Sequence, residues 1–167
     1  MSQLELQYGP EWWTPPNVLV SLWPRYASEV IAGRKRFEFR RGLFIKRAAT
    51  AFIYATAPKG REDRELTCSA LVAVARFGPP IIGIEAVSAL IAREQAGGSL
   101  PTTDWLGGYD TASAHPIEQV HRLNNPIGLA EIRERFPGFQ PPQRHISLDR
   151  NPTFLFFLRE RSGLVRI

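Results

Sequence analysis

One short stretch near the N-terminus changes its periodicity, and this change constrains the fold more than any other feature of the sequence. Residues 18–22 are apolar and predict a strand. Pro24 suits the first position of a helix, because its missing N–H would be unpaired there anyway, and apolar residues follow at helical spacing up to Gly33. A glycine can end a helix in the left-handed conformation. From 36 to 40 charged and aromatic residues alternate, which predicts a half-buried strand.

The rest of the chain predicts more strands than helices. Strands are predicted from apolar segments at 51–57, 66–77, 116–123 and 153–158, the last of them rich in phenylalanine. Helices are predicted from 84 to the glycines at 97 and 98 and at 129–136, with a glycine-rich loop at 99–116. Strands do not alternate regularly with long helices, as a doubly wound fold requires. We therefore expect an α+β fold on a mainly antiparallel, barrel-like sheet with a few short flanking helices.

The length of 167 residues fits one folded domain. Residues 1–17 carry two tryptophans and a Pro-Pro pair without helical or strand periodicity, so we expect an irregular N-terminal arm and a single domain at 18–167. No apolar run approaches the ~20 residues that cross a bilayer, and residues 1–10 lack the basic start and apolar stretch of a secretion signal. We expect a cytoplasmic protein with no membrane partner.

Positive charge is concentrated in one part of the chain. Between residues 25 and 64 eleven basic side chains face four acidic ones, whereas the whole chain has a net charge of +5. A localised patch of this kind favours a polyanion, because neutralising phosphates releases condensed counterions. The alternative is a solvated face in a chain that prefers arginine to lysine. The patch favours nucleic acid as the partner.

Metal and disulfide chemistry are not predicted. Cys68 is the only cysteine, which excludes a disulfide framework and a thiolate metal site, and it lies in an apolar run where a small buried thiol is expected. The histidines at 115, 121 and 145 lack the short spacings that place two ligands on one metal. We expect no metal and no cofactor.

Three segments in order resemble the ASCH domain of the PUA-like superfamily. They are VSLWPRYASEVIAGRKRFEFRR, FIYATAP and FQPPQRHISL, at 20–41, 52–58 and 139–148. The core motif of the family, Gly-x-Lys-x-x-Glu-x-Arg, is filled here by Gly33, Lys35, Glu38 and Arg40. The resemblance implies a small PUA-like β-barrel, with a cleft between the barrel and a short helix that the motif residues line.

The resemblance also implies activities. Such domains are proposed to bind RNA, some small members deacetylate N4-acetylcytidine, and others are described as ribonucleases. The deacetylases use a threonine where this chain has Glu38. We expect binding of RNA, as a single-stranded or modified nucleotide, in a basic cleft. The alternatives are a hydrolase, acting on a modified nucleoside or on RNA with Lys35 and Glu38 as its acid/base pair, and a module for another small ligand or a protein.

Side-chain chemistry gives each candidate residue a role. Phosphates suit Lys35, Lys59 and Arg40, whose planar guanidinium presents two parallel donors. Glu38 can orient Arg40 or read a polar edge of a base or ribose. Aromatic rings can stack on an unpaired base, a contact of ~1 to 3 kcal/mol, although core packing is the alternative for each ring. The nucleic-acid-binding candidates are Trp23, Arg25, Tyr26, Lys35, Glu38, Arg40, Tyr54, Lys59, Gln143 and His145.

Overall fold

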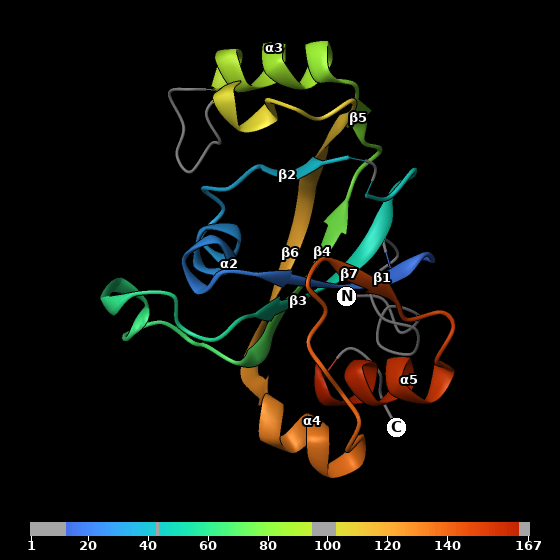
Figure 1. The fold of residues 1–167 in the computed structure, drawn as a ribbon. Coiled ribbons are helices and arrows are strands. Elements are labelled where there is room, and N and C mark those ends of the chain that lie inside the picture. Colours follow the sequence, from blue (N-terminus) through green and yellow to red (C-terminus); the bar gives the residue numbers. More distant parts are fainter. Residues whose placement is uncertain (1–12, 43, 95–102, 164–167) are drawn as a thin grey trace.

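The computed structural model describes residues 13–42, 44–94 and 103–163. In this part of the chain seven strands form one curled sheet in the order β2-β6-β4-β3-β1-β7, with β5 paired to β6 (Figure 1). Only β1 and β3 pair in parallel, and the other pairs are antiparallel. The strands are β1 (Asn17–Leu22), β2 (Phe37–Arg41), β3 (Ala49–Ala55), β4 (Ala70–Phe77), β5 (Ile81–Ile82), β6 (Ala112–Gly128) and β7 (His145–Ser147).

Four α-helices flank the sheet within the described residues. In Figure 1, α3 lies at one end of the molecule, α4 and α5 lie together at the other, and α2 lies beside the sheet between them. The arrangement is an α+β fold built on a mixed, mostly antiparallel half-barrel, so the predicted fold class is confirmed. The helices are α2 (Pro24–Ile31), α3 (Ile84–Glu94), α4 (Leu129–Arg135) and α5 (Pro152–Arg161), and two short 3-10 turns are η1 (Arg61–Asp63) and η2 (Thr103–Leu106).

The strand, helix and strand predicted near the N-terminus are confirmed. Pro24 is the first residue of α2, and the helix gives way to Gly33, whose φ of +73° lies in the left-handed region. The backbone N–H groups of Arg34 and Lys35 both donate to the carbonyl of Glu29 at 3.0 Å, which satisfies a carbonyl near the helix end. This compact exit turns the chain directly from α2 into β2.

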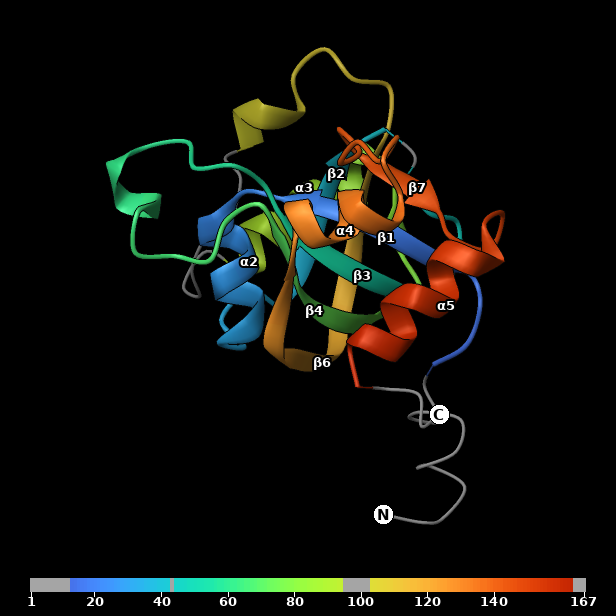
Figure 2. The ribbon, with the colours of Figure 1, turned by 90° about the horizontal axis from the view of Figure 1, so that it is seen from below.

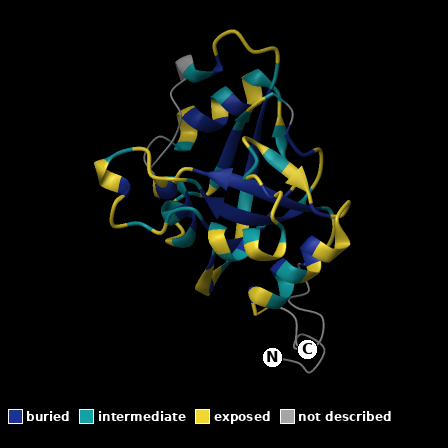
Figure 3. Ribbon diagram, turned by 60° about the horizontal axis from the view of Figure 1, so that its bottom comes forward, coloured by how far each residue is buried: buried dark blue, intermediate teal, exposed yellow. Residues whose placement is uncertain are grey.

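The central strand β3 is buried along its whole length, as the dark blue strands of Figure 3 illustrate. Because side chains alternate across a strand, β3 contributes to two apolar clusters. Ile53 packs in the cluster that includes residues of α2, whereas Phe52 and Tyr54 pack in the cluster beneath α4 and α5 (Figure 2). A third cluster joins α3 to Phe39 of β2 and to the first residues of β6.

The long strand β6 corrects the predicted strand at 116–123 and the last part of the predicted loop. Its first residues pair with β2 and β5, and its later residues pair with β4. Residues 112–115 are Ala, Ser, Ala and His, all 0% exposed. These residues are small or polar and do not alternate with apolar ones. The sequence therefore contains no local pattern that predicts a strand here, although neighbouring strands bury these residues. β4 also begins at Ala70, later than the predicted start at residue 66.

The predicted closing strand at 153–158 is wrong, because these residues belong to helix α5. Asn151 caps the helix by accepting a hydrogen bond from the Phe154 N–H at 3.1 Å, and Pro152 occupies the first turn. Phe154, Leu155 and Leu158 are buried, and this spacing is helical. The phenylalanines of this segment suggested a strand. The segment is instead a helix, because one helical face packs on the sheet.

The described end of the N-terminal arm packs on the α5 side of the sheet. Trp13 is 8% exposed and meets the Phe52 ring edge-on, with 5.2 Å between the ring centroids. The Thr50 hydroxyl donates to the carbonyl of Thr14 at 2.9 Å. Trp12 and the rest of the predicted arm lie outside the described residues. No helix in the described ranges is both long and apolar enough to cross a bilayer.

Candidate functional site

A cleft of about 730 Å³ opens along the seam of the half-barrel. The main strand order begins with β2 and ends with β7, and a sheet that curls without closing leaves an opening between these two strands. Residues of β1, α2, β2 and β7 line the cleft, together with the loop after β3, the loop after η2 and the segment that leads into β7. Topology therefore brings five stretches of the chain to one site, at 21–26, 35–44, 56–59, 105–109 and 141–145.

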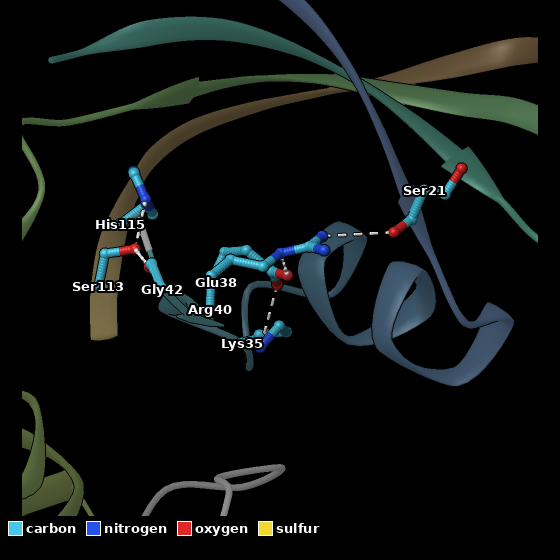
Figure 4. A network of polar contacts seen from close by, with 7 residues as sticks. All are labelled: Ser21, Lys35, Glu38, Arg40, Gly42, Ser113 and His115. Carbon is cyan, nitrogen blue, oxygen red and sulfur yellow. Dashed lines mark hydrogen bonds and ion pairs between the residues drawn. The ribbon is translucent and has the colours of Figure 1, made fainter. Parts of the chain in front are cut away.

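Glu38 is the buried centre of the cleft floor (Figure 4). Its Oε2 lies 3.4 Å from the Lys35 Nζ, and its Oε1 lies 2.8 Å from the Arg40 Nε. A carboxylate that is 5% exposed needs such partners, because an unpaired buried charge is costly. The polar face of β2 is thus turned into the seam. Both Glu38 oxygens are engaged, so this residue fixes the two cations.

Arg40 joins the two sides of the seam. One of its Nη atoms donates to the backbone carbonyl of Ser21 in β1 at 3.4 Å, a long contact that Figure 4 shows on the right of the network. Its guanidinium carbon lies 4.7 Å from the centroid of the Phe44 ring. An arginine held by a carboxylate, a carbonyl and a ring keeps its orientation, so its remaining donors are presented to the cleft in a fixed geometry.

Two histidines flank the Phe44 ring. The ring centroids of His145 in β7 and His115 in β6 lie 4.5 and 4.9 Å from that of Phe44, both edge-on. The His115 Nε2 lies 3.3 Å from the Ser113 hydroxyl, which in turn donates to the Gly42 carbonyl at 3.3 Å. His145 lines the cleft, whereas His115 lies behind it and is 0% exposed.

The surroundings keep both imidazoles neutral at pH 7. Burial, with Arg40 and His145 nearby, lowers the pKa of His115 to about 4. Burial, followed by the charges of Arg40 and Arg144, lowers the pKa of His145 below its ordinary value. His145 is therefore a neutral imidazole on the cleft wall, which is the protonation state of a general base.

Positive charge exceeds negative charge in the lining of the cleft. Its ionised side chains are the carboxylate of Glu38 and five cations, namely Lys35, Arg40, Arg41, Lys59 and Arg144. Lys59 comes from the loop after β3, where its backbone N–H donates to Asp63 at 2.7 Å and so steadies the loop. The cleft is suited to an anion with several charges.

The structure gathers eight of the ten nucleic-acid-binding candidates into this cleft. Arg25 is not among the lining residues, but its guanidinium carbon lies 4.9 and 5.0 Å from the Trp23 and Tyr26 ring centroids. Tyr54 corrects the prediction, since it is 1% exposed and belongs to the core beneath α4 and α5, where it meets Phe139 edge-on. A base cannot stack on a ring buried in that way.

Sequence reasoning missed several lining residues. Phe44 follows β2 and stands between the two histidines, and Arg41 lies 5.1 Å from the ring centroids of both Trp105 and Tyr109. The one available signal was the presence of two large aromatic residues in a segment otherwise rich in glycine, serine and threonine. Their approach to β2 depends on contacts far apart in the sequence.

No group of three or more His, Cys, Asp or Glu side chains in the described residues is arranged to hold a metal ion. Cys68 is half-buried rather than fully buried, and burial, with the charge of Asp63, raises the pKa of its thiol. Its Sγ lies 3.5 Å from the Asp63 carbonyl oxygen, outside the lining of the cleft. The chemistry of the cleft therefore comes from cations, imidazole and aromatic rings.

Comparison with known proteins identifies relatives of this chain. No family model matches it. It is 28% identical over 129 residues to an ASCH domain-containing ribonuclease of Zymomonas mobilis, across 76% of this chain and 80% of that protein. The crystal structure of ASCH from Zymomonas mobilis has a TM-score of 0.66 at 26% identity, over 86% of this chain and 95% of that one. A point mutant of the same protein gives the same score and identity, over 86% and 96%.

These relationships agree with the position of the motif. Gly33, Lys35, Glu38 and Arg40 fill the pattern Gly-x-Lys-x-x-Glu-x-Arg, and the last three form the ion-paired floor of the cleft. The relatives share both the sequence over most of their length and the half-barrel that holds this floor. The chain is similar in sequence and in fold to ASCH domain proteins.

Proposed function

We propose that this protein is a ribonuclease that cleaves single-stranded RNA in the cleft. The observation that carries the proposal is the juxtaposition, in one cleft, of five cations, one fully ion-paired carboxylate and a neutral histidine. Cations bind and orient phosphates, and a neutral imidazole accepts a proton at pH 7. The name of the Zymomonas relative, an ASCH domain-containing ribonuclease, supports the same activity.

The reaction that suits these groups is an internal phosphoryl transfer. The His145 imidazole takes the proton of the ribose 2′-hydroxyl, the 2′-oxygen forms a bond to phosphorus, and the bond from phosphorus to the 5′-oxygen breaks. The Lys35 ammonium donates a proton to the departing 5′-oxygen. Arg40 stabilises the negative charge that develops on the phosphate oxygens. The products are a 2′,3′-cyclic phosphate and a 5′-hydroxyl.

Glu38 takes a different role from the one predicted for it. The sequence suggested Lys35 and Glu38 as an acid/base pair, but the two Glu38 oxygens are each engaged by a cation, Oε2 by Lys35 at 3.4 Å and Oε1 by Arg40 at 2.8 Å. In this proposal Glu38 positions Lys35 and Arg40, and His145 is the base. The hydroxyl that a threonine supplies to the N4-acetylcytidine deacetylases has no counterpart in a carboxylate at this position.

A second candidate function is RNA binding without cleavage. The excess of cations over carboxylates in the cleft favours it, because such a surface binds phosphates whether or not the bound RNA is cut. The two functions share Lys35, Arg40 and Lys59 as phosphate contacts and differ in the use of His145. A modified nucleotide is an equally suitable occupant of the cleft.

The test is cleavage of an end-labelled single-stranded RNA by the wild-type protein and by His145→Gln. We expect fragments that end in a 2′,3′-cyclic phosphate, and a rate about 10² to 10⁴ times lower in the variant, which is the usual contribution of a general base. His145→Gln should bind the RNA with nearly unchanged affinity. If the wild-type protein binds the RNA but produces no fragments, RNA binding without cleavage is the function that remains. If His145→Gln cleaves the RNA as fast as the wild type does, His145 is not the general base.

A further inference from the structure

Two clusters of arginine and aromatic rings contribute to the same cleft. The first platform consists of Trp23, Tyr26 and Arg25, with the two rings stacked at 5.9 Å between centroids and 12° between planes. The second platform consists of Trp105, Tyr109 and Arg41. The four rings line the cleft together with the floor residues, so the platforms share one ligand-accessible space.

The second platform is assembled from distant parts of the chain. Arg41 ends β2, and its guanidinium carbon lies 5.1 Å from the centroids of both the Trp105 and Tyr109 rings. Its Nη1 also lies 3.5 Å from the Tyr109 hydroxyl. Trp105 packs on the cluster that joins Phe39 to α3, so the platform is anchored to the folded body. Both rings also line the cleft.

Exposure of these rings has no structural explanation. Three described aromatic residues rank among the large exposed apolar side chains: Trp23 at 44%, Tyr109 at 41% and Phe156 at 56%. Two of the three line the cleft, which is a small part of the surface. A ring left in water contributes little to the core, whereas it can stack on a base, because every base has a π-face. Arginine planes stack on bases as well.

The floor cations and the second platform meet at two consecutive residues. Successive side chains of a strand point to opposite sides, so Arg40 turns to Glu38 and Phe44 while Arg41 turns to Trp105 and Tyr109. The cleft follows this edge strand, with β2 residues from both sides in its lining. Its volume of about 730 Å³ lies in the upper part of the ~300 to 1,000 Å³ range of small-ligand sites, which leaves room for more than one base.

We propose that the second platform binds a nucleobase, so that the cleft holds two consecutive nucleotides with their shared phosphate at Lys35 and Arg40. The inference rests on the proposed function, which it deepens by defining the minimal substrate as a dinucleotide unit of single-stranded RNA. One base stacks at Trp23 and its neighbour at Tyr109. The platforms then fix the two sugars on either side of the phosphate that is cut.

The experiment uses a 2′-O-methyl dinucleotide, which cannot be cleaved, and two derivatives that each lack one of its bases. Binding of all three is measured for the wild-type protein and for Tyr109→Ala. We expect Tyr109→Ala to weaken binding of the complete dinucleotide about fivefold or more, as for loss of one stacking contact. One of the two abasic derivatives should bind wild type and Tyr109→Ala equally, because the base that Tyr109 contacts is already missing from it.

Two variants serve as controls. Tyr109→Phe keeps the ring and should keep the affinity. Phe156→Ala removes a ring that is 56% exposed on α5, outside the lining of the cleft, and should change nothing. Because Tyr109 is itself 41% exposed, its replacement should leave the fold intact, which a thermal melt verifies.

The result that would overturn the inference is a Tyr109→Ala protein that binds the complete dinucleotide as wild type does, or that loses affinity equally for both abasic derivatives. Undetectable dinucleotide binding by the wild type would overturn it too. If RNA cleavage and its dependence on His145 persist in any of these cases, the second platform alone is disproved. If the wild type neither binds the dinucleotide nor cleaves RNA, the proposed function falls with it.

Discussion

Two regions on opposite sides of the sheet place an arginine over an aromatic ring, and only one of them opens to a cleft. Arg40 lies 4.7 Å from the Phe44 ring centroid in the seam, and Arg159 of α5 lies 5.0 Å from that of Trp13. We call the second region, consisting of Trp13, Asn17, Asp149 and Arg159, the α5 cluster. Both regions contain a carboxylate, which is buried in the seam (Glu38) and exposed in the α5 cluster (Asp149).

The difference lies in how the polar groups are used. In the α5 cluster Asp149 accepts from the backbone and side-chain N–H groups of Asn17 at 2.9 and 2.8 Å, and Arg159 donates to the side-chain Oδ1 of Asn17 at 3.3 Å. These groups tie the start of β1 to the C-terminal helix. In the cleft one carboxylate serves two of five lining cations. The cleft therefore differs from the α5 cluster in its excess of cations beside open space, and both regions have an arginine over a ring.

Replacing the arginine of each region should give the largest difference in the rate of RNA cleavage. This pair of variants is therefore the strongest test of the comparison. We expect Arg40→Ala to lower the rate of RNA cleavage about 10²- to 10³-fold, the usual loss for one donor to a developing negative charge. Arg159→Ala should cleave RNA at the wild-type rate at a temperature where both variants are folded. Initial rates at one salt concentration measure the difference, and equal losses would show that the two regions are functionally alike.

Acid should destabilise the protein through the histidine behind the cleft. His115 is neutral when folded down to about pH 4, whereas the unfolded chain protonates it below about pH 6.5. The unfolding free energy should therefore fall as the pH decreases from 6.5 to 4, by about 3 kcal/mol, and this contribution should level off below pH 4. Denaturant unfolding of wild type and His115→Gln at several pH values tests it. A parallel pH dependence in the two proteins would contradict it.

Loss of the carboxylate in the α5 cluster should affect stability and leave function unchanged. Asp149→Ala removes the acceptor of two hydrogen bonds from Asn17. We expect the unfolding free energy to fall by about 2 kcal/mol, because partly buried donors lose their partner. Affinity for single-stranded RNA, measured where the variant is folded, should equal that of wild type. A large loss of affinity would mean that the α5 cluster also contributes to binding.

The smallest expected effect concerns a cation at the rim of the cleft. Lys59→Ala should weaken RNA binding by a few-fold and reduce the salt dependence, the slope of log affinity against log salt, by about 0.7, as for one phosphate contact on a single strand. Arg161→Ala provides the matched control, because Arg161 pairs with Glu131 on the surface between α4 and α5. Identical slopes for the two variants would remove Lys59 from the phosphate path.

Local patterns predicted much of the fold and part of the site. The strand, helix and strand from β1 to β2 have local causes, a proline at the helix start and a left-handed glycine after its end, and so could be predicted. Lys35, Glu38 and Arg40 lie within this stretch, which is why they could be predicted to lie close together. The burial of Glu38 was missed, because it depends on how the sheet curls.

Other features required long-range contacts. The Asn151-Pro152 pair was an available helix-start signal, but the phenylalanines that follow it also suit a strand, and only packing on the sheet distinguishes the two. Tyr54 was a stacking candidate because an aromatic ring can stack on a base, with core packing as the alternative, and β3 is buried on both faces. Trp105 and Tyr109 reach the cleft through the packing of α3 on β2, which no local pattern encodes.

The curl of the sheet has a consequence for the behaviour of the protein in concentrated solution. An open sheet normally presents two unpaired strand edges, which pair with other chains and cause aggregation. Here β2 and β7 are the edges, and the contact of Arg40 with the Ser21 carbonyl draws β2 toward the side of the sheet where β7 lies. The edges border a positively charged trough, where neighbouring molecules repel one another. The shape that we propose for binding a polyanion should thereby also discourage self-association.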